Sequence, residues 1–247
     1  MSDLGWLTRR PVAHRGLHDS SAGIIENTAS AVDAAVAADF AIEVDLQLSA
    51  DGIPMVFHDD TLDRLTTTVG PVAERTATAL AAVPFKATAD RMMPLEALLA
   101  RVDGRVPLVI ELKSGAVPAF DLAATVAARI ATYPGRAALM SFDPRLLPVI
   151  RRTAPQVPRG IVAEQDFAAD EWPGLSWWQR AMLGHLLHWP ASHFQFVAYR
   201  VADLDAYAPR LARTFGLPVL TWTVRTPADR ARAARYADQM IFEGFRP

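Results

Sequence analysis

The 247-residue chain contains no cysteine. That absence excludes disulfide bonds, a thiolate nucleophile and any zinc site built on cysteine ligands. An excess of basic residues is missing too, because the formal net charge at pH 7 is −2. Proteins that bind nucleic acid usually present a basic face. We therefore expect no nucleic-acid partner.

Long hydrophobic runs are also absent. No stretch of about 18 consecutive apolar residues occurs, so we expect no membrane-spanning helix and no stable membrane insertion. The N-terminal stretch "MSDLGWLTRRPVAHRG" lacks the apolar segment of a signal peptide. Together these features predict a cytoplasmic protein. They do not indicate its oligomeric state.

The chain instead contains short apolar runs that alternate with helical patterns. Eight β-rich runs begin at Pro11, Ala41, Pro107, Ala137, Arg159, Phe194, Pro218 and Gln239. Helices are predicted between most of them, at residues 26–39, 120–133, 144–153, 175–189, 204–215 and 227–237. Such alternation indicates parallel strands joined by right-handed crossovers.

Eight strand–helix units in a chain of this length predict an α/β fold, a (β/α)8 TIM barrel, as one domain over residues 1–247. A doubly wound open sheet is the alternative, but no Gly-rich turn follows the first strand. The gap between strands two and three, residues 52–105, is too long for a simple crossover, although it contains a predicted helix at 93–102. We expect this insertion to build the pocket.

Three carboxylates fall on the second and third predicted strands. Glu43 and Asp45 are two residues apart in "AIEVDLQL" and so share one face of the strand, while Glu111 lies in "PLVIELK". Functional residues of a TIM barrel gather at the C-terminal strand ends. An all-oxygen trio suits one divalent cation, Mg2+ or Ca2+. Alternatively, the three acids pair with Arg15 and Lys113 as salt bridges without a metal.

Two histidines and two cations frame the acidic trio. His14 and His58 come from separate segments and suit general acid and base catalysis near neutral pH, although either alone would more often be structural. Arg15 and Lys113 indicate an anionic substrate, such as a phosphate ester. Lys113 has a second interpretation, as the Schiff-base lysine of an aldolase with Glu111 shuttling the proton.

Short motifs follow one another in a distinctive order. They are "HRG" (14–16), "EN" (26–27), "EVD" (43–45), "DGIPMVFHD" (51–59), "TLDRLT" (61–66), "MPLEALL" (93–99), "ELK" (111–113), "SFDPRLL" (141–147) and "WTV" (222–224). This order resembles the glycerophosphodiester phosphodiesterase family. The resemblance implies a barrel that hydrolyses glycerophosphodiesters to sn-glycerol 3-phosphate and an alcohol. A lysophospholipase D-like phosphodiesterase, or a transesterase acting on lysophospholipids, is the nearest alternative.

The resemblance also implies roles for individual residues. Glu43, Asp45 and Glu111 would hold Mg2+ or Ca2+, and His14 and His58 would be the acid/base pair. The phosphate would be bound by Arg15 and Lys113, with Trp222 as an apolar wall beside the glycerol. Glu26 would hold Arg15 in place. Asn27 lies near the same mouth, but it equally suits a helix cap.

The last quarter of the chain departs from the family pattern. Arg225 stands where the family usually has Asn, and Phe242-Glu243 stands in place of a Thr-Asp pair. Arg225 either favours a second anionic group on the leaving side of the substrate or pairs with Glu243 across neighbouring strands.

Two further groups of residues are interpreted as structural. Four tryptophans near the fifth helix are expected to pack it onto the barrel, some of them covering its outer rim, with a membrane surface as the alternative: Trp172, Trp177, Trp178 and Trp189. His185 and His188 are expected to share a helix face, but with His193 they are not expected to form a second metal site. His18 and Asp19 are expected in a solvated loop.

Overall fold

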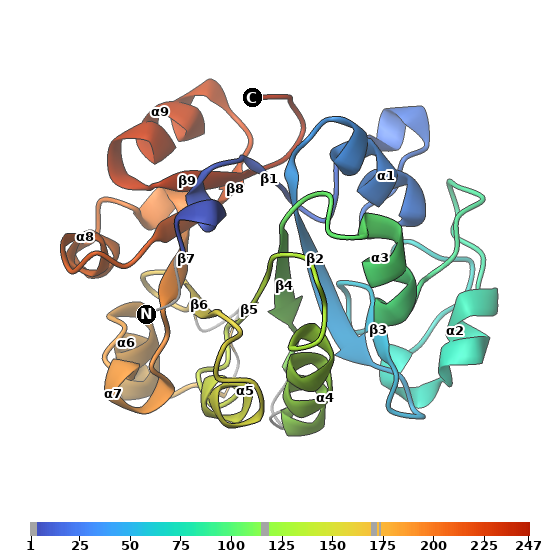
Figure 1. The fold of residues 1–247 in the computed structure, drawn as a ribbon, viewed down its shortest axis with the longest axis horizontal. Coiled ribbons are helices and arrows are strands. Elements are labelled where there is room, and N and C mark those ends of the chain that lie inside the picture. Colours follow the sequence, from blue (N-terminus) through green and yellow to red (C-terminus); the bar gives the residue numbers. More distant parts are fainter. Residues whose placement is uncertain (1–3, 115–118, 169–171, 173) are drawn as a thin grey trace.

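Eight parallel strands close into a barrel (Figure 1). The computed structural model describes residues 4–114, 119–168, 172 and 174–247. The strand β1 pairs with both β2 and β9, which closes the sheet. This confirms the predicted TIM barrel. The barrel strands are β1 Val12–Ala13, β2 Ala41–Leu48, β4 Leu108–Leu112, β5 Ala137–Ser141, β6 Arg159–Ala163, β7 Phe196–Arg200, β8 Val219–Val224 and β9 Gln239–Phe242.

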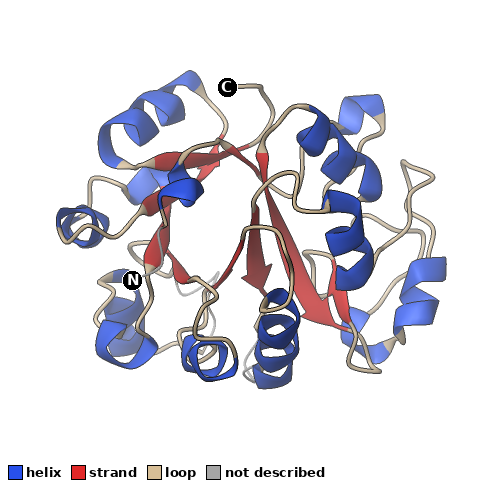
Figure 2. Cartoon of the chain, in the orientation of Figure 1, coloured by secondary structure: helices blue, strands red, loops and turns tan. Residues whose placement is uncertain are grey.

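Helices surround the strands on the outside (Figure 2). They are α1 Ala29–Ala37, α3 Leu95–Val102, α4 Phe120–Ile130, α5 Leu147–Thr153, α6 Trp177–Gly184, α7 Trp189–Ser192, α8 Tyr207–Thr214 and α9 Pro227–Tyr236. Among the described residues, no helix combines the length and hydrophobicity needed to cross a bilayer.

The single helix predicted at residues 175–189 is wrong. The chain forms α6 and α7 instead, and Leu186 between them has a left-handed φ of 59°. A Cβ atom at position 184 would overlap the carbonyl oxygen of Gln165 in the loop after β6. Glycine therefore allows a close approach to this loop that a larger residue would prevent. His185 and His188 therefore flank the break and do not share one helix face.

The tryptophan prediction holds only in part. Trp172 packs against Phe142 and Phe167, with ring centroids 5.0 and 5.2 Å apart. Trp177 and Trp178 are 76% and 52% exposed, so the packing prediction is wrong for them. Trp189 is 46% exposed and donates a hydrogen bond from its indole to the Phe194 carbonyl.

The alternation of side chains on β2 divides the core into two compartments. Ile42, Val44 and Leu46 face the layer between strands and helices, where the largest apolar cluster lies. A second cluster fills the barrel interior and includes Trp6 and Leu7 from the short 3-10 helix η1 Gly5–Thr8. Near the C-terminal strand ends, charged side chains line the interior together with apolar ones such as Met140, Val162 and Ile241.

The insertion after β2 has a small core of its own. It contains β3 Pro54–Val56, antiparallel to β2, then η3 Val72–Glu74 and α2 Ala77–Ala82. A third apolar cluster packs this segment against the loop before α1 and consists of Ile25, Met55, Phe57, Leu62, Val72, Leu80, Val83, Phe85 and Met92. This cluster fixes the residues that follow β3 beside the barrel mouth.

Candidate active site

A cavity of about 200 Å³ opens at the C-terminal ends of the strands. Most of the residues predicted as functional line it: His14, Arg15, Glu43, His58, Glu111, Lys113, Trp222 and Arg225. Asp45, Glu26 and Asn27 lie directly behind this lining, in contact with Arg15 or with one another. The structure thus brings together side chains from β1, β2, the insertion, β4 and β8.

The three carboxylates converge because of strand register. The pairing of β2 with β4 sets Asp45 opposite Glu111, and Glu43 lies one pleat earlier on the same face. One oxygen of each carboxylate lies within 4.8 Å of the others, and all three residues are buried. Burial, together with the charges of Asp45 and Glu111, raises the pKa of Glu43 well above its ordinary value. Such an all-oxygen donor set fits a hard divalent cation.

Asp45 is held ionised by its surroundings. Burial alone would raise its pKa, but nearby positive charges, chiefly that of Lys113, hold that pKa far below the ordinary value. The side chain of Asn27 donates a 2.9 Å hydrogen bond to Asp45 Oδ2. The helix-cap interpretation of Asn27 is wrong, because Thr28 occupies the N-cap of α1 and Asn27 has a φ of 58°.

Arg15 is anchored on three sides. Its backbone N–H donates to Glu43 Oε2 at 2.9 Å, and its Nη1 donates to Glu26 Oε1 at 2.7 Å. Its Nε lies 3.4 Å from Asp45 Oδ2. The next residue, Gly16, has a φ of 82°, and a Cβ there would lie 2.8 Å from that of Ala31 on α1. Only glycine allows this turn to approach the helix so closely. The side chains of Arg15 and Glu26 thus form an ion pair at the mouth of the barrel.

Lys113 is unsuited to Schiff-base chemistry. Its Nζ lies 3.1 Å from Glu111 Oε1 and 3.7 Å from Asp45 Oδ1. Burial alone would lower the pKa of Lys113, but these carboxylates raise it above its ordinary value. A Schiff base forms from a neutral amine, so this environment disfavours the aldolase interpretation.

Each pocket histidine has a carboxylate on its Nδ1 atom. His14 Nδ1 lies 2.7 Å from Glu243 Oε2, and His58 Nδ1 lies 2.8 Å from Asp59 Oδ1. Burial lowers the pKa of His14, while the hydrogen bond with Glu243 acts in the opposite direction. With Nδ1 engaged in this way, Nε2 is the other nitrogen of each ring, and that of His14 lies 4.0 Å from Glu43 Oε2.

Glu243 links His14 to Arg225. Arg225 Nη2 donates to Glu243 Oε2 at 2.9 Å, so the ion pair considered from the sequence is present. The hydrogen bonds from His14 and Arg225 lower the pKa of Glu243 to about 2. The sequence indicated Glu243 as a departure from the family pattern and as a possible partner of Arg225, but not as the partner of His14. Nothing in the local sequence could pair it with a residue 229 positions away.

Trp222 separates the pocket from a second, more open hollow of about 590 Å³. Its indole donates a 2.9 Å hydrogen bond to the Ala198 carbonyl, and its ring meets Phe142 edge-on at 5.4 Å. Both hollows are lined by Phe142, Trp222, Thr223 and Arg225, so they adjoin. The second hollow is also lined by Glu164, Trp172, Arg200 and Asp229.

Among the described residues, no histidine is grouped with Glu43, Asp45 and Glu111 as a potential metal ligand. In the described part of the chain, two groups of three potential metal ligands come together: the trio itself, and His14 with His18 and Glu243. The second group already contains the bonded His14–Glu243 pair, and Arg225 places a positive charge on it. His188 instead bonds Ser192 Oγ at 2.9 Å.

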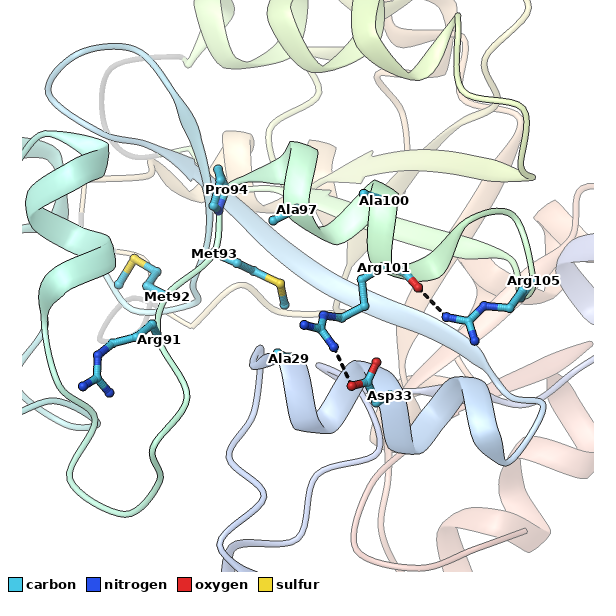
Figure 3. A pocket seen from close by; sticks show the side chains of 10 residues that line it. All are labelled: Ala29, Asp33, Arg91, Met92, Met93, Pro94, Ala97, Ala100, Arg101 and Arg105. Carbon is cyan, nitrogen blue, oxygen red and sulfur yellow. Dashed lines mark hydrogen bonds and ion pairs between the residues drawn. The ribbon is translucent and has the colours of Figure 1, made fainter.

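A groove of about 700 Å³ on the outside of the barrel lies away from this chemistry. It runs between α1 and α3 and is lined by Met92, Met93 and Arg101, among others (Figure 3). Arg101 is bonded there to Asp33. None of the predicted site residues lines the groove, so the candidate active site is the smaller strand-end cavity.

Comparison with known proteins identifies relatives. A sequence profile described as the glycerophosphoryl diester phosphodiesterase family matches residues 14–244. Glycerophosphodiester phosphodiesterase 1 of Bos taurus is 26% identical over 240 residues, covering 87% of this chain and 71% of the bovine protein. The glycerophosphodiester phosphodiesterase of Caldanaerobacter subterraneus is 32% identical over 162 residues, covering 61% of this chain and 65% of that protein.

Solved structures share the fold. A Silicibacter pomeroyi protein assigned as a glycerophosphoryl diester phosphodiesterase has a TM-score of 0.74 at 26% identity, over 94% of this chain and 89% of that one. An Oleispira antarctica phosphodiesterase, solved with its product sn-glycerol-3-phosphate, has a TM-score of 0.75 at 19% identity, over 94% and 91% of the two chains. The profile match covers nearly the whole chain. The chain therefore belongs to the glycerophosphoryl diester phosphodiesterase family, a family of phosphoric diester hydrolases.

Proposed function

We propose that the chain hydrolyses glycerophosphodiesters to sn-glycerol 3-phosphate and an alcohol, with one divalent cation, Mg2+ or Ca2+. The observation that carries this proposal is the strand-end pocket. There, two carboxylate-backed histidines face an acidic trio flanked by two cations. The product bound in the Oleispira antarctica relative is the molecule that this proposal expects.

Glu43, Asp45 and Glu111 would hold the cation, which supplies positive charge to polarise a phosphoryl oxygen when bound. Arg15 and Lys113 bind the remaining phosphate oxygens. Their anchors on neighbouring carboxylates keep both cations oriented before the substrate arrives.

His14 and His58 move the protons. The Nε2 atom of one histidine accepts a proton from the nucleophile, and that of the other donates a proton to the oxygen of the leaving alcohol. We favour the 2-hydroxyl of the glycerol as the nucleophile, which gives a cyclic phosphate that water then opens. Direct attack by water is the alternative, and trapping the cyclic product distinguishes the two routes.

Trp222 forms the wall beside the glycerol, and the adjoining hollow receives the leaving alcohol. That hollow presents the rings of Phe142, Trp172 and Trp222, and it is about three times as large as the catalytic cavity. Its size leaves room for head groups larger than glycerol. The same space is what a lysophospholipase D-like activity would require.

A release assay tests the proposal directly. Glycerophosphocholine, glycerophosphoethanolamine, glycerophosphoglycerol and lysophospholipids are each incubated with Mg2+, with Ca2+ and with EDTA. We expect sn-glycerol 3-phosphate from at least one glycerophosphodiester with a divalent cation, and none with EDTA. His14→Ala and His58→Ala serve as inactive controls. No turnover of any substrate with either cation would overturn the proposal.

A further inference from the structure

Arg64 lies just outside the pocket, and its guanidinium group donates hydrogen bonds to two carboxylates. It comes from the loop after β3 and is absent from the cavity lining. Its Nε and Nη2 donate to the two oxygens of Asp59 at 2.6 and 2.8 Å. Its Nη1 and Nη2 donate to the two oxygens of Glu26 at 2.9 and 2.8 Å. Fork geometry of this kind fixes the position and orientation of both acids.

Each of these two carboxylates has a second partner inside the pocket. Asp59 Oδ1 lies 2.8 Å from Nδ1 of His58, and Glu26 Oε1 accepts a 2.7 Å hydrogen bond from Nη1 of Arg15. An unbroken series of contacts therefore runs from His58 through Arg64 to Arg15. Neither His58 nor Arg15 is in hydrogen-bond contact with Arg64 itself.

The two ends of this series belong to different parts of the fold. His58 follows β3 in the insertion, which packs on a small apolar cluster of its own. Arg15 follows β1 and belongs to the barrel. Arg64 and Glu26 are 38 residues apart, and their ion pair bridges the insertion and the segment leading into α1. Apolar packing holds the insertion near the barrel. The Arg64–Glu26 ion pair sets the distance and angle between the insertion and the segment before α1.

We propose that Arg64 is a positioning residue that fixes the acid/base histidine His58 relative to the phosphate-binding Arg15. The inference rests on the proposed function and adds a residue to it that touches neither substrate nor cation. Only a guanidinium can bond four oxygens of two carboxylates in one plane, so lysine cannot replace it. We expect its removal to lower the reaction rate, because small displacements of catalytic groups reduce the rate by large factors.

Three single variants test the inference on whichever glycerophosphodiester the wild type turns over. For Arg64→Gln we expect kcat to fall and KM to rise, with kcat/KM lower by about ten- to 100-fold. Arg64→Lys keeps the positive charge but lacks the planar guanidinium group. We expect it to recover less than half of the loss in log kcat/KM that Arg64→Gln shows. Arg91→Gln is the matched control, because Arg91 lies in the same insertion and, within the described part of the chain, donates hydrogen bonds only to the carbonyls of Ala89 and Asp90.

Chemical rescue separates positioning from folding. We expect guanidinium chloride at millimolar concentration to restore part of the kcat of Arg64→Ala, while ammonium chloride does not. Thermal unfolding of each variant shows whether it is folded at the assay temperature. If Arg64→Ala does not fold, the kinetics of Arg64→Gln, Arg64→Lys and Arg91→Gln decide the inference without rescue.

Double-mutant cycles locate the two arms of the contact series. Combining Arg64→Gln with Asp59→Asn should give a non-additive loss in kcat. Combining it with Glu26→Gln should give a non-additive loss in KM or in the inhibition constant of sn-glycerol 3-phosphate.

Each result has a distinct meaning. Additive losses, or Arg64→Gln kinetics equal to those of Arg91→Gln, would overturn the inference while leaving the proposed function intact. A wild type that turns over no glycerophosphodiester would instead overturn the function.

Discussion

The Nδ1 atom of His14 lies 2.7 Å from Oε2 of Glu243, and the two residues follow the first and last strands of the barrel. The pairing fixes the ring so that Nε2 faces the cavity, 4.0 Å from Glu43. Because the pKa of Glu243 is about 2, the carboxylate stays ionised and the proton between the two groups belongs to His14. This arrangement selects one tautomer of the histidine.

The first prediction concerns this pair. Glu243→Gln replaces the carboxylate with an amide that can accept from or donate to the ring, so the histidine loses its fixed tautomer. We expect kcat to fall by roughly 100-fold with little change in KM, by analogy with other carboxylate–histidine pairs. Steady-state kinetics check this, with Asp238→Asn, immediately before β9, as a control. An unchanged kcat for Glu243→Gln would show that the pairing is not used.

The second prediction concerns Arg225. Its side chain is 55% exposed and is paired with Glu243. We expect Arg225→Asn to lower kcat/KM by less than tenfold, and by the same factor for all leaving alcohols, because an exposed ion pair contributes little. Release rates for substrates with anionic, neutral and cationic head groups check this. A loss confined to anionic head groups would show instead that Arg225 contacts the substrate.

The third prediction concerns the carboxylate trio. Burial and the neighbouring charges of Asp45 and Glu111 raise the pKa of Glu43, so an ionised Glu43 destabilises the fold when no cation is bound. We expect Glu43→Gln to abolish metal-dependent activity while leaving the Tm in EDTA equal to or higher than that of the wild type. Adding Mg2+ or Ca2+ should raise the Tm of the wild type only. A lower Tm for the variant in EDTA would contradict this explanation.

The fourth prediction concerns His188, which lies far from the pocket. Burial lowers its pKa to about 4, below the ordinary value of 6.5. The unfolded chain therefore binds a proton more readily than the folded one between these two values, and stability falls as the pH drops through this window. From pH 7 to pH 5 the loss attributable to His188 is about 2 kcal/mol.

Urea unfolding at the two pH values measures this loss. In His188→Asn, we expect the difference in free energy of unfolding between pH 7 and pH 5 to shrink by that amount. His193→Asn, at the end of the same short helix, is the control. The same pH dependence in His188→Asn as in the wild type would exclude His188 as its source.

The periodic features of the fold could be predicted from the sequence. Alternating runs indicated the closed barrel, and the i, i+2 spacing of Glu43 and Asp45 on a strand indicated a shared face. Glu111 could be added because adjacent parallel strands place their C-terminal ends side by side. These predictions needed only local periods and one topological rule.

Contacts between distant segments could not be predicted in this way. The partner of His14 comes from the end of the chain, and Arg64 bonds Glu26 across two loops. The helix break near Gly184 depends on a close approach to Gln165, and helical periodicity carries no sign of it. The exposure of Trp177 likewise depends on which face of α6 meets the barrel.

The closure of the barrel between β1 and β9 has a consequence for protein synthesis. Ile241 on β9 lines the catalytic cavity, and Glu243, directly after β9, is the partner of His14. A chain that stops before Gln239 lacks both β9 and Glu243, so the sheet cannot close on β1 and His14 has no Glu243 partner. Hydrolysis is therefore expected to require synthesis to continue past Glu243, and fragments that stop before β9 are expected to be inactive.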